Sequence, residues 1–464
     1  MEHILLLHNG FAVTSESIRR CSLLCRENLE VFYPDEEDMV DSGVVGPEGK
    51  IEFGKLPEAV MEKFGKENVE VIDITGKYVF AGGIDAHVHF RDPGLTHKAD
   101  FHTESLAALA GGVTTVMDMP NTNPPTTSAQ ALKEKMQIAA EKSAVRAGFN
   151  IGATNSNADS ICNLLENADP ETGICKDDFA GIKIFMGSST GNMLVDDGDA
   201  LHKLFNQRIK PVQVHCEDEA TIRENLESAK REYGNDIPFR MHPSIRSRSA
   251  CIKSSAKALE LAVKYGTRLT LCHISTKEEL DMVKAAKLHN PDITAETSCN
   301  YLWFCDRDYD ILGSRVKCNP SIKSESDREA LRIALKDGAI DTIGSDHAPH
   351  LLSEKMKSYL EAPSGMPSIQ QTLPVLLTVA KQEGIPLTRI ASVFSEKASE
   401  IYGLKRGKIR DGYASDLVVV DIDKEFTVRN EDQRSKCGWT PYDGVTLTGL
   451  IEIVVLNGEA HILN

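Results

Sequence analysis

The feature that most constrains the fold of this chain is an alternation of short apolar runs with longer amphipathic segments through its middle. Such alternation predicts parallel βα units, in which each helix crosses over between neighbouring strands. The predicted strands are the run 78–86 with the two histidines that follow it, and residues 114–119, 146–152, 181–186, 211–215, 269–273, 293–297 and 342–346. The predicted helices include residues 101–110, 128–141, 250–265, 277–289 and 326–336. Eight strands favour a closed (β/α)8 TIM-type barrel over an open sheet, within the α/β class.

The two ends of the chain have short strands and turns in place of this alternation. They comprise residues 1–75 and 405–464, and chain ends commonly meet at a domain surface. We therefore expect a small β-sandwich domain formed from both ends and a barrel over residues 76–404. A chain of 464 residues is long for one compact core, and this division accounts for its length.

The composition argues against several classes of partner. The formal net charge of −17 and the isoelectric point near 5.3 disfavour nucleic acid and anionic membrane surfaces. No apolar run approaches the roughly 20 residues of a membrane span, and the first residues lack the basic start of a signal peptide. The eleven cysteines have no regular spacing, which fits reduced thiols better than a disulfide framework. We expect a cytoplasmic protein that acts on a small molecule.

The segment His87-Val88-His89-Phe90-Arg91 ends the first predicted strand. Alternation along a strand places His87 and His89 on one face, where two imidazoles can bind a single metal ion. Continued alternation brings Arg91, a permanently charged planar donor, to the same face. The pattern indicates a metallohydrolase that binds an anionic substrate beside its metal.

Further polar residues interrupt or end other apolar strands. Lys183 lies within one strand, while His215, His273 and Asp346 each end another. Barrel enzymes carry their catalytic groups at the carboxyl ends of the strands. Because an unpaired buried charge is costly, these polar residues are expected to share one site with His87 and His89.

Several motifs resemble the dihydroorotases of the amidohydrolase superfamily. They are the run from His87 to Lys98, Gly111-Gly112-Val113-Thr114-Thr115, Met119-Pro120-Asn121-Thr122-Asn123-Pro124, Lys317-Cys318-Asn319-Pro320, Ser345-Asp346-His347-Ala348-Pro349-His350, and the run from Gly407 to Leu417. The resemblance extends from about residue 70 to 460. It implies a metal-dependent barrel with a β domain built from the chain ends.

The resemblance implies two zinc ions per chain. His87, His89 and Asp346 would bind one, and His215 and His273 the other. Two metal ions in such a site lie roughly 3.5–4 Å apart and need a bridging anion, which an ammonium group cannot supply. The resemblance points to Lys183 carboxylated by CO₂ on its side-chain nitrogen. An aspartate bridges in some relatives, which leaves Asp196 or Asp197 as the alternative here.

The resemblance also implies the substrate and the reaction. The enzyme would reversibly hydrolyse the cyclic amide of (S)-dihydroorotate to N-carbamoyl-L-aspartate, a step of de novo pyrimidine (UMP) biosynthesis. Asp346 would shuttle the proton, and homodimers are common among relatives. The residues expected to bind substrate are Arg91, Asn121 and His350 at the carboxylate and Asn319 at the ring.

Other readings stay open at this point. A hydantoinase, dihydropyrimidinase or allantoinase would use the same metals on other cyclic amides, and an inactive homologue would serve as a non-catalytic scaffold. Cys272 and Glu296 could bind an extra metal ion, or could be a buried thiol and a structural carboxylate. The chain also has Ser298-Cys299-Asn300-Tyr301 where many relatives carry paired histidines, a change expected to alter packing around the site.

Overall fold

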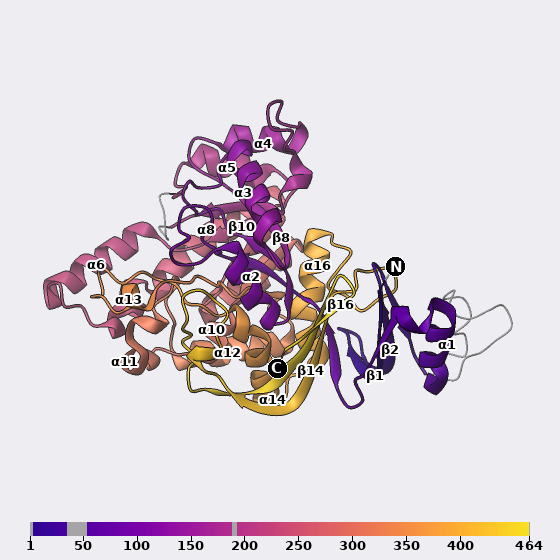
Figure 1. Ribbon diagram of the computed structural model, residues 1–464. Helices are drawn as coiled ribbons and strands as arrows, with labels where there is room; N and C mark the ends of the chain where they lie inside the picture. Colours follow the sequence, from indigo (N-terminus) through magenta and orange to yellow (C-terminus); the bar gives the residue numbers. More distant parts are fainter. Residues whose placement is uncertain (1–2, 35–52, 188–192, 464) are drawn as a thin grey trace.

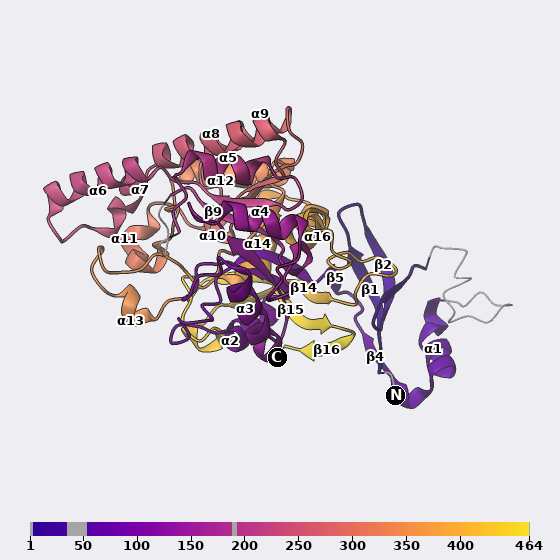
Figure 2. The ribbon, with the colours of Figure 1, turned by 90° about the horizontal axis from the view of Figure 1, so that it is seen from above.

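The computed structural model describes residues 3–34, 53–187 and 193–463. The chain forms a barrel surrounded by helices and a second sheet that lies beside it (Figure 1). Strands from the C-terminal end of the chain lie between the barrel and the strands from the N-terminal end in both views (Figure 2). Among the described residues, no helix is long and apolar enough to cross a membrane.

The barrel contains eight strands, each hydrogen-bonded in parallel to the next along the chain. They are β6 (Gly83–Val88), β7 (Val113–Asp118), β8 (Arg146–Gly152), β9 (Gly181–Phe185), β10 (Val212–His215), β11 (Leu269–Leu271), β12 (Ile293–Thr297) and β13 (Thr342–Ile343). Val88 forms a parallel bridge with His347, and the backbone N–H of His89 donates to the His347 carbonyl at 2.9 Å. These contacts join the first strand to the segment after the last and nearly close the barrel.

Most helices of the chain cover the outside of the barrel or its rim. They are α2 (Phe101–Ala110), α3 (Ala129–Lys142), α4 (Ala158–Glu166), α5 (Gly198–Asn206), α6 (Glu219–Tyr233), α7 (His242–Ile245), α8 (Arg248–Tyr265), α9 (Lys277–Lys287), α10 (Cys299–Trp303), α11 (Asp308–Leu312), α12 (Glu325–Asp337), α13 (Leu352–Lys355), α14 (Thr372–Glu383), α15 (Leu387–Ala391) and α16 (Lys397–Tyr402). Many begin at a side-chain cap; Thr276 and Glu279, for example, form a capping box at α9. Because helices cover the outer face, every residue of β6, β7, β9, β10, β11, β12 and β13 is buried, the polar ones included.

The ends of the chain form one eight-stranded sheet in the order β16-β15-β14-β5-β1-β2-β3, with β4 beside β1. Its strands are β1 (Ile4–Val13), β2 (Ile18–Cys25), β3 (Leu29–Phe32), β4 (Val69–Asp73), β5 (Tyr78–Ala81), β14 (Leu417–Thr427), β15 (Thr446–Leu456) and β16 (Glu459–Ile462). Helix α1 (Leu56–Phe64) packs on β4 at the edge away from the barrel (Figures 1 and 2). The central pairing of β5 with β14 joins residues from opposite ends of the chain.

The structure confirms the barrel and a separate β domain made from both chain ends, which is one continuous eight-stranded sheet where a β-sandwich was expected. All eight predicted barrel strands are present, and β8 and β12 have the predicted bounds. The apolar run 78–86 is divided between two sheets, because β5 pairs with β1 and β14 while β6 pairs with β7. The sheet of the chain ends therefore includes residues on the barrel side of the expected boundary at residue 75.

Candidate metal centre and substrate site

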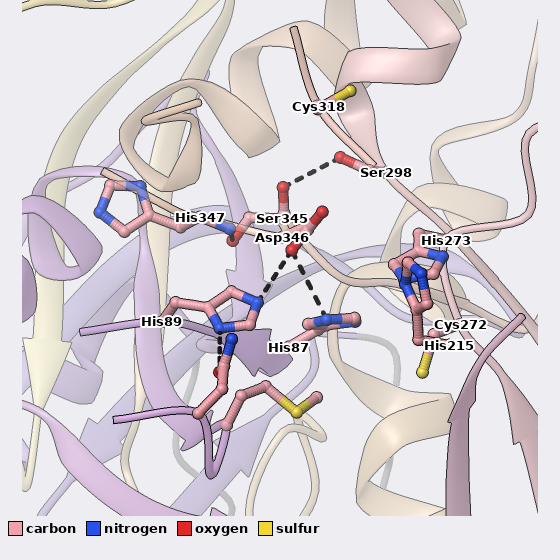
Figure 3. Close-up of polar contacts among 12 residues, drawn as sticks. His87, His89, His215, Cys272, His273, Ser298, Cys318, Ser345, Asp346 and His347 are labelled. Atoms are coloured by element: carbon pink, nitrogen blue, oxygen red, sulfur yellow. Dashed lines mark hydrogen bonds and ion pairs between the residues drawn. The ribbon is translucent and has the colours of Figure 1, made fainter. Parts of the chain in front are cut away.

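Three of the predicted ligands converge at the carboxyl end of the barrel. Asp346 Oδ1 lies 3.1 Å from His89 Nε2 and 3.5 Å from His87 Nε2. The two histidines come from the end of β6, and Asp346 follows β13 on the other side of the barrel closure. Figure 3 shows the carboxylate of Asp346 turned toward both rings. One nitrogen from each histidine and one carboxylate oxygen are therefore grouped as a metal ion requires.

The second predicted pair lies beside the first. His215 ends β10, and its Nδ1 lies 2.9 Å from His273 Nε2. The ring centres of His273 and His87 are 5.2 Å apart, so the two groups face each other across one site (Figure 3). The side chain of Lys183, fully buried in β9, places its Nζ 3.3 Å from Cys272 Sγ, next to His273 in the chain. The barrel thus brings all six predicted metal-site residues together.

Several backbone conformations at the site are unusual. Only five described non-glycine residues have positive φ, and Arg91, His273 and Asp346 are three of them, with φ of 66°, 38° and 48°. Left-handed backbone is uncommon for such residues and concentrates at functional sites. Because β6 ends at Val88, strand alternation does not place Arg91. The turn after the strand directs its side chain instead.

Side-chain acceptors orient the three ligand histidines that come from β6 and β10. His87 Nδ1 lies 2.7 Å from Glu296 Oε1, and His89 Nδ1 lies 2.7 Å from Asn121 Oδ1. When these Nδ1 atoms donate, the lone pair of each ring lies on Nε2, toward Asp346. His215 Nε2 lies 3.1 Å from Glu217 Oε2, which leaves its Nδ1 facing His273. Each ring is therefore held with one nitrogen turned into the site.

Two of these orienting roles extend the sequence interpretation. Asn121 was expected at the substrate, and its oxygen contacts the ring of His89. Glu217 was not predicted, although it follows His215 by only two residues. Because β10 ends at His215, the turn after the strand directs the Glu217 side chain. Glu217 is fully buried and forms an ion pair with Arg246, which stabilises its charge. The sequence signal that could have identified Glu217 is its position two residues after the predicted ligand His215.

Burial sets the protonation of the site. It lowers the pKa of His87 well below the usual value, assisted by the positive charge of Lys183, and it lowers the pKa of His273 and His215 as well. Burial alone would raise the pKa of Asp346, but the attraction of His87, His89 and His273 outweighs it and lowers that pKa. The lowered pKa values favour the neutral imidazole at His87, His215 and His273, and the lowered pKa of Asp346 keeps its carboxylate ionised; these are the forms that bind metals.

The donor set fits zinc. Neutral imidazole nitrogens and a carboxylate oxygen are common zinc ligands. His215 Nδ1 and His273 Nε2 face each other, and His273 Nδ1 is buried without a hydrogen-bond partner in the described part of the chain. A cation between the two rings would use both facing lone pairs. A second group, His87, Cys272 and Glu296, also has donor atoms close together, but Glu296 lies within hydrogen-bonding distance of His87 and Cys272 of Lys183.

Asp196 and Asp197, the alternative bridging residues, lie at the surface rather than in the barrel. Asp196 and Asp197 are exposed, and the Asp197 side chain accepts from the Ala200 N–H as the N-cap of α5. Asp196 accepts from the Asn155 amide at 2.8 Å. These contacts occupy both carboxylates at the surface, whereas Lys183 is buried within the barrel.

The segment that departs from the resembling family supports the end of β13. Ser298 Oγ donates to the Ser345 carbonyl at 2.9 Å, as drawn in Figure 3. Asn300 donates to the same carbonyl at 3.4 Å and accepts from Tyr442 at 3.0 Å. Since Ser345 precedes Asp346, these bonds hold the backbone that carries the carboxylate. These residues therefore take part in the packing around the site.

The predicted substrate residues form a cationic subsite next to the metal ligands. Arg91 is 2% exposed; its Nε donates to the Pro349 carbonyl at 3.1 Å, and its Nη2 lies 3.0 Å from His350 Nε2. Lys98 Nζ lies 3.1 Å from His350 Nδ1, on the other side of that ring, and 3.1 Å from Glu354. Asn319 Oδ1 is buried without a hydrogen-bond partner among the described residues. A buried guanidinium beside an open acceptor suits a small anion with ring N–H groups.

Comparison with known proteins identifies the family of the chain. The model of the Amidohydrolase family matches residues 78–460. The dihydroorotase of Methanosarcina mazei is 34% identical over 407 residues, covering 85% of this chain and 86% of that protein. The dihydroorotase of Staphylococcus epidermidis is 33% identical over 411 residues, covering 88% of this chain and 93% of that protein.

Solved structures show the same fold. The L-hydantoinase (dihydropyrimidinase) of Arthrobacter aurescens superposes with a TM-score of 0.85 at 24% identity, over 100% of this chain and 98% of that one. The dihydropyrimidinase of Brevibacillus agri gives 0.84 at 23% identity, over 100% and 95%. At this identity the likeness concerns the fold alone. The family match and the curated relatives, together with the site at the strand ends, show that the chain belongs to the amidohydrolase family.

Proposed function

We propose that this protein is a dihydroorotase, which reversibly hydrolyses the cyclic amide of (S)-dihydroorotate to N-carbamoyl-L-aspartate in de novo pyrimidine biosynthesis. The observation that carries the proposal is the buried Arg91–His350 pair beside the His87, His89 and Asp346 group. Dihydroorotate has a carboxylate next to its cyclic amide, which this arrangement matches. Curated relatives at 33–34% identity carry the name dihydroorotase, which supports the same substrate.

We propose two zinc ions as the cofactors. His87, His89 and Asp346 would hold one, and His215 and His273 the other, with Lys183 between them. Lys183 Nζ is fully buried and has no carboxylate within ion-pair distance among the described residues. A buried unpaired ammonium is costly. Addition of CO₂ to the neutral amine gives a carbamate and releases one proton, and this anion would offset the charge of the metals.

The chain's own residues orient the substrate. Arg91, His350 and Asn121 would bind the carboxylate, and the side-chain oxygen of Asn121 also contacts the ring of His89. Asn319 Oδ1, buried without a partner in the described structure, would accept from a ring N–H. Bound zinc would polarise the amide carbonyl and acidify the attacking water. Asp346, ionised because His87 and His89 adjoin it, would take the proton of that water and deliver it to the departing ring nitrogen.

The cellular location, the partner and the assembly of the protein are also part of the proposal. We place the enzyme in the cytoplasm, where reduced thiols persist; all eleven cysteines are free in the structure. The partner is the small-molecule substrate rather than nucleic acid or membrane. The proposal of a homodimer rests on the resemblance to relatives among which homodimers are common.

Ring opening of L-dihydroorotate, followed by ultraviolet absorbance, tests the proposal directly. Dihydrouracil, hydantoin and allantoin are measured in parallel, and zinc is quantified on the same sample. Turnover confined to dihydroorotate with about two zinc ions per chain is the expected result. Faster turnover of an uncharged cyclic amide would assign the protein to the hydantoinase type, and a metal-free protein without turnover would indicate a scaffold.

A further inference from the structure

Two buried lysines outside the expected substrate residues lie behind the Arg91–His350 subsite. Lys355, the last residue of α13, is 0% exposed, and Lys317 is 7% exposed. No described carboxylate forms an ion pair with either of them. Lys98, by contrast, is paired with Glu354 at 3.1 Å. Buried lysines without an acidic partner are rare, because removal of an ammonium group from water is costly.

Backbone carbonyls compensate these two charges. Lys355 Nζ donates to the carbonyls of Lys317, Pro363 and Gly365 at 3.0, 2.9 and 2.8 Å. Three acceptors require three N–H bonds, which only the ammonium form has. Lys317 Nζ donates to the carbonyls of Tyr359 and Ala362 at 2.7 and 2.6 Å and lies over the Tyr359 ring. The geometry therefore favours the ammonium form of both lysines, while burial lowers the pKa of Lys355 and lowers that of Lys317 to about 8.

All the acceptors except the Lys317 carbonyl belong to one loop, residues 359–365. Every carbonyl from Ala362 to Gly365 has a lysine or histidine partner. The lysines bind those of Ala362, Pro363 and Gly365, and the Ser364 carbonyl lies 3.1 Å from His350 Nε2. The loop packs closely on the substrate subsite: a Cβ added at Gly365, where φ is +139°, would lie 3.0 Å from a ring carbon of His350. The two lysines hold the loop against His350, the residue that contacts Arg91.

The same arrangement places positive charge around the subsite. Lys355 and Arg91 repel each other electrostatically, and Lys317 repels Lys355. Carbonyl dipoles satisfy the hydrogen bonds of these groups, but they do not cancel the net charge. In a buried site such charges interact strongly with an incoming anion, since little water screens them.

We propose that Lys355 and Lys317 are positioning residues that fix the 359–365 loop against Arg91 and His350, and that their charge gives the site its preference for cyclic amides bearing a carboxylate. This inference rests on the proposed function. It extends the specificity determinant beyond the residues that touch the substrate, to groups that act through the loop and through their electric field.

The test compares two substrates in variants of the zinc-loaded protein. Lys355→Met removes the charge and all three donors, and Lys317→Gln removes the charge but keeps an N–H donor. The matched control is Lys287→Met, a lysine that donates to the Ala339 carbonyl and to Asp341 at the opposite end of the barrel. For each protein, kcat and KM are measured with dihydroorotate and with uncharged dihydrouracil, alongside zinc content.

The expected result for Lys355→Met is a rise of about tenfold in KM for dihydroorotate, with kcat within about twofold and zinc content unchanged. The preference for dihydroorotate over dihydrouracil falls by the same factor, whereas Lys287→Met leaves it unchanged. An unchanged preference in Lys355→Met, or equal losses on both substrates, would overturn the proposal. If Lys355→Met does not fold, Lys317→Gln decides the question by the same ratio. Absence of dihydroorotate turnover in the unaltered protein would instead refute the proposed function.

Discussion

The two sides of the site are held by different kinds of contact. On the metal side (His87, His89, His215, His273 and Asp346), acidic or amide side chains orient three of the rings. On the carboxylate side (Arg91, His350, Lys317 and Lys355), the cations donate to backbone carbonyls. The metal side projects from barrel strands or from the residues directly after them, whereas the carboxylate side depends on a loop.

This difference indicates that the metal side carries out the reaction, whereas the carboxylate side selects the substrate. Strands at the barrel centre are buried on both faces and hold side chains rigidly, as a metal centre requires. A loop held by lysines can differ between related enzymes without disturbing the strands. The comparison predicts that changes on the metal side lower kcat or metal content, while changes on the carboxylate side alter KM and substrate preference.

The largest effect is expected from Asp346→Asn. The amide keeps the shape of the side chain but cannot accept the proton, so kcat for dihydroorotate falls by about 10³-fold or more, with KM little changed. Steady-state kinetics measure this, with Asp341→Asn at the opposite end of the barrel as the control. A rise in KM with kcat preserved would place Asp346 in binding and break the division between the two sides.

Arg91→Met should have the next largest effect. The buried guanidinium contacts Pro349 and His350 at once, and its loss lowers kcat/KM for dihydroorotate by about 10²-fold, mainly through KM. Turnover of dihydrouracil, which has no carboxylate, serves as the internal control and stays close to that of the unaltered enzyme. Equal losses on both substrates would contradict a carboxylate-binding role.

Glu296→Gln sharpens the comparison within the metal side. An amide oxygen accepts from His87 Nδ1 more weakly than a carboxylate, so zinc affinity falls by about 10- to 100-fold. Competition with a chelator measures the affinity. Glu279→Gln provides the control, because Glu279 is equally buried but caps α9. If both variants retained zinc equally well, Glu296 would have no orienting role.

The smallest effect is expected from Trp439→Phe. Trp439 Nε1 donates to the His350 carbonyl at 2.7 Å and so ties the C-terminal segment to the carboxylate side. Loss of this bond lowers the free energy of unfolding by about 1 kcal/mol, measured by urea denaturation. KM for dihydroorotate rises by no more than about threefold, with kcat and zinc content unchanged. A drop in zinc content would show that the two sides are coupled.

Much of the fold could be predicted because its signals are local. Strands β8 and β12 have the predicted bounds, because short-range signals mark where such strands end, as Asn290-Pro291-Asp292 does before β12. Predictions at the strand ends were less accurate: β11 stops at Leu271 and β13 at Ile343, before His273 and Asp346. The backbone at both residues is left-handed, and that depends on contacts across the barrel.

The sequence by itself determined the barrel, the sheet from both chain ends and the identity of the polar residues at the strand ends. Polar groups in apolar runs are visible one residue at a time. Only the tertiary structure decided which ring nitrogen of each histidine faces the site, because the partners Glu296 and Asn121 come from other strand ends. It alone revealed the roles of Lys317 and Lys355, since their partners are backbone carbonyls, which every residue possesses and no sequence pattern distinguishes.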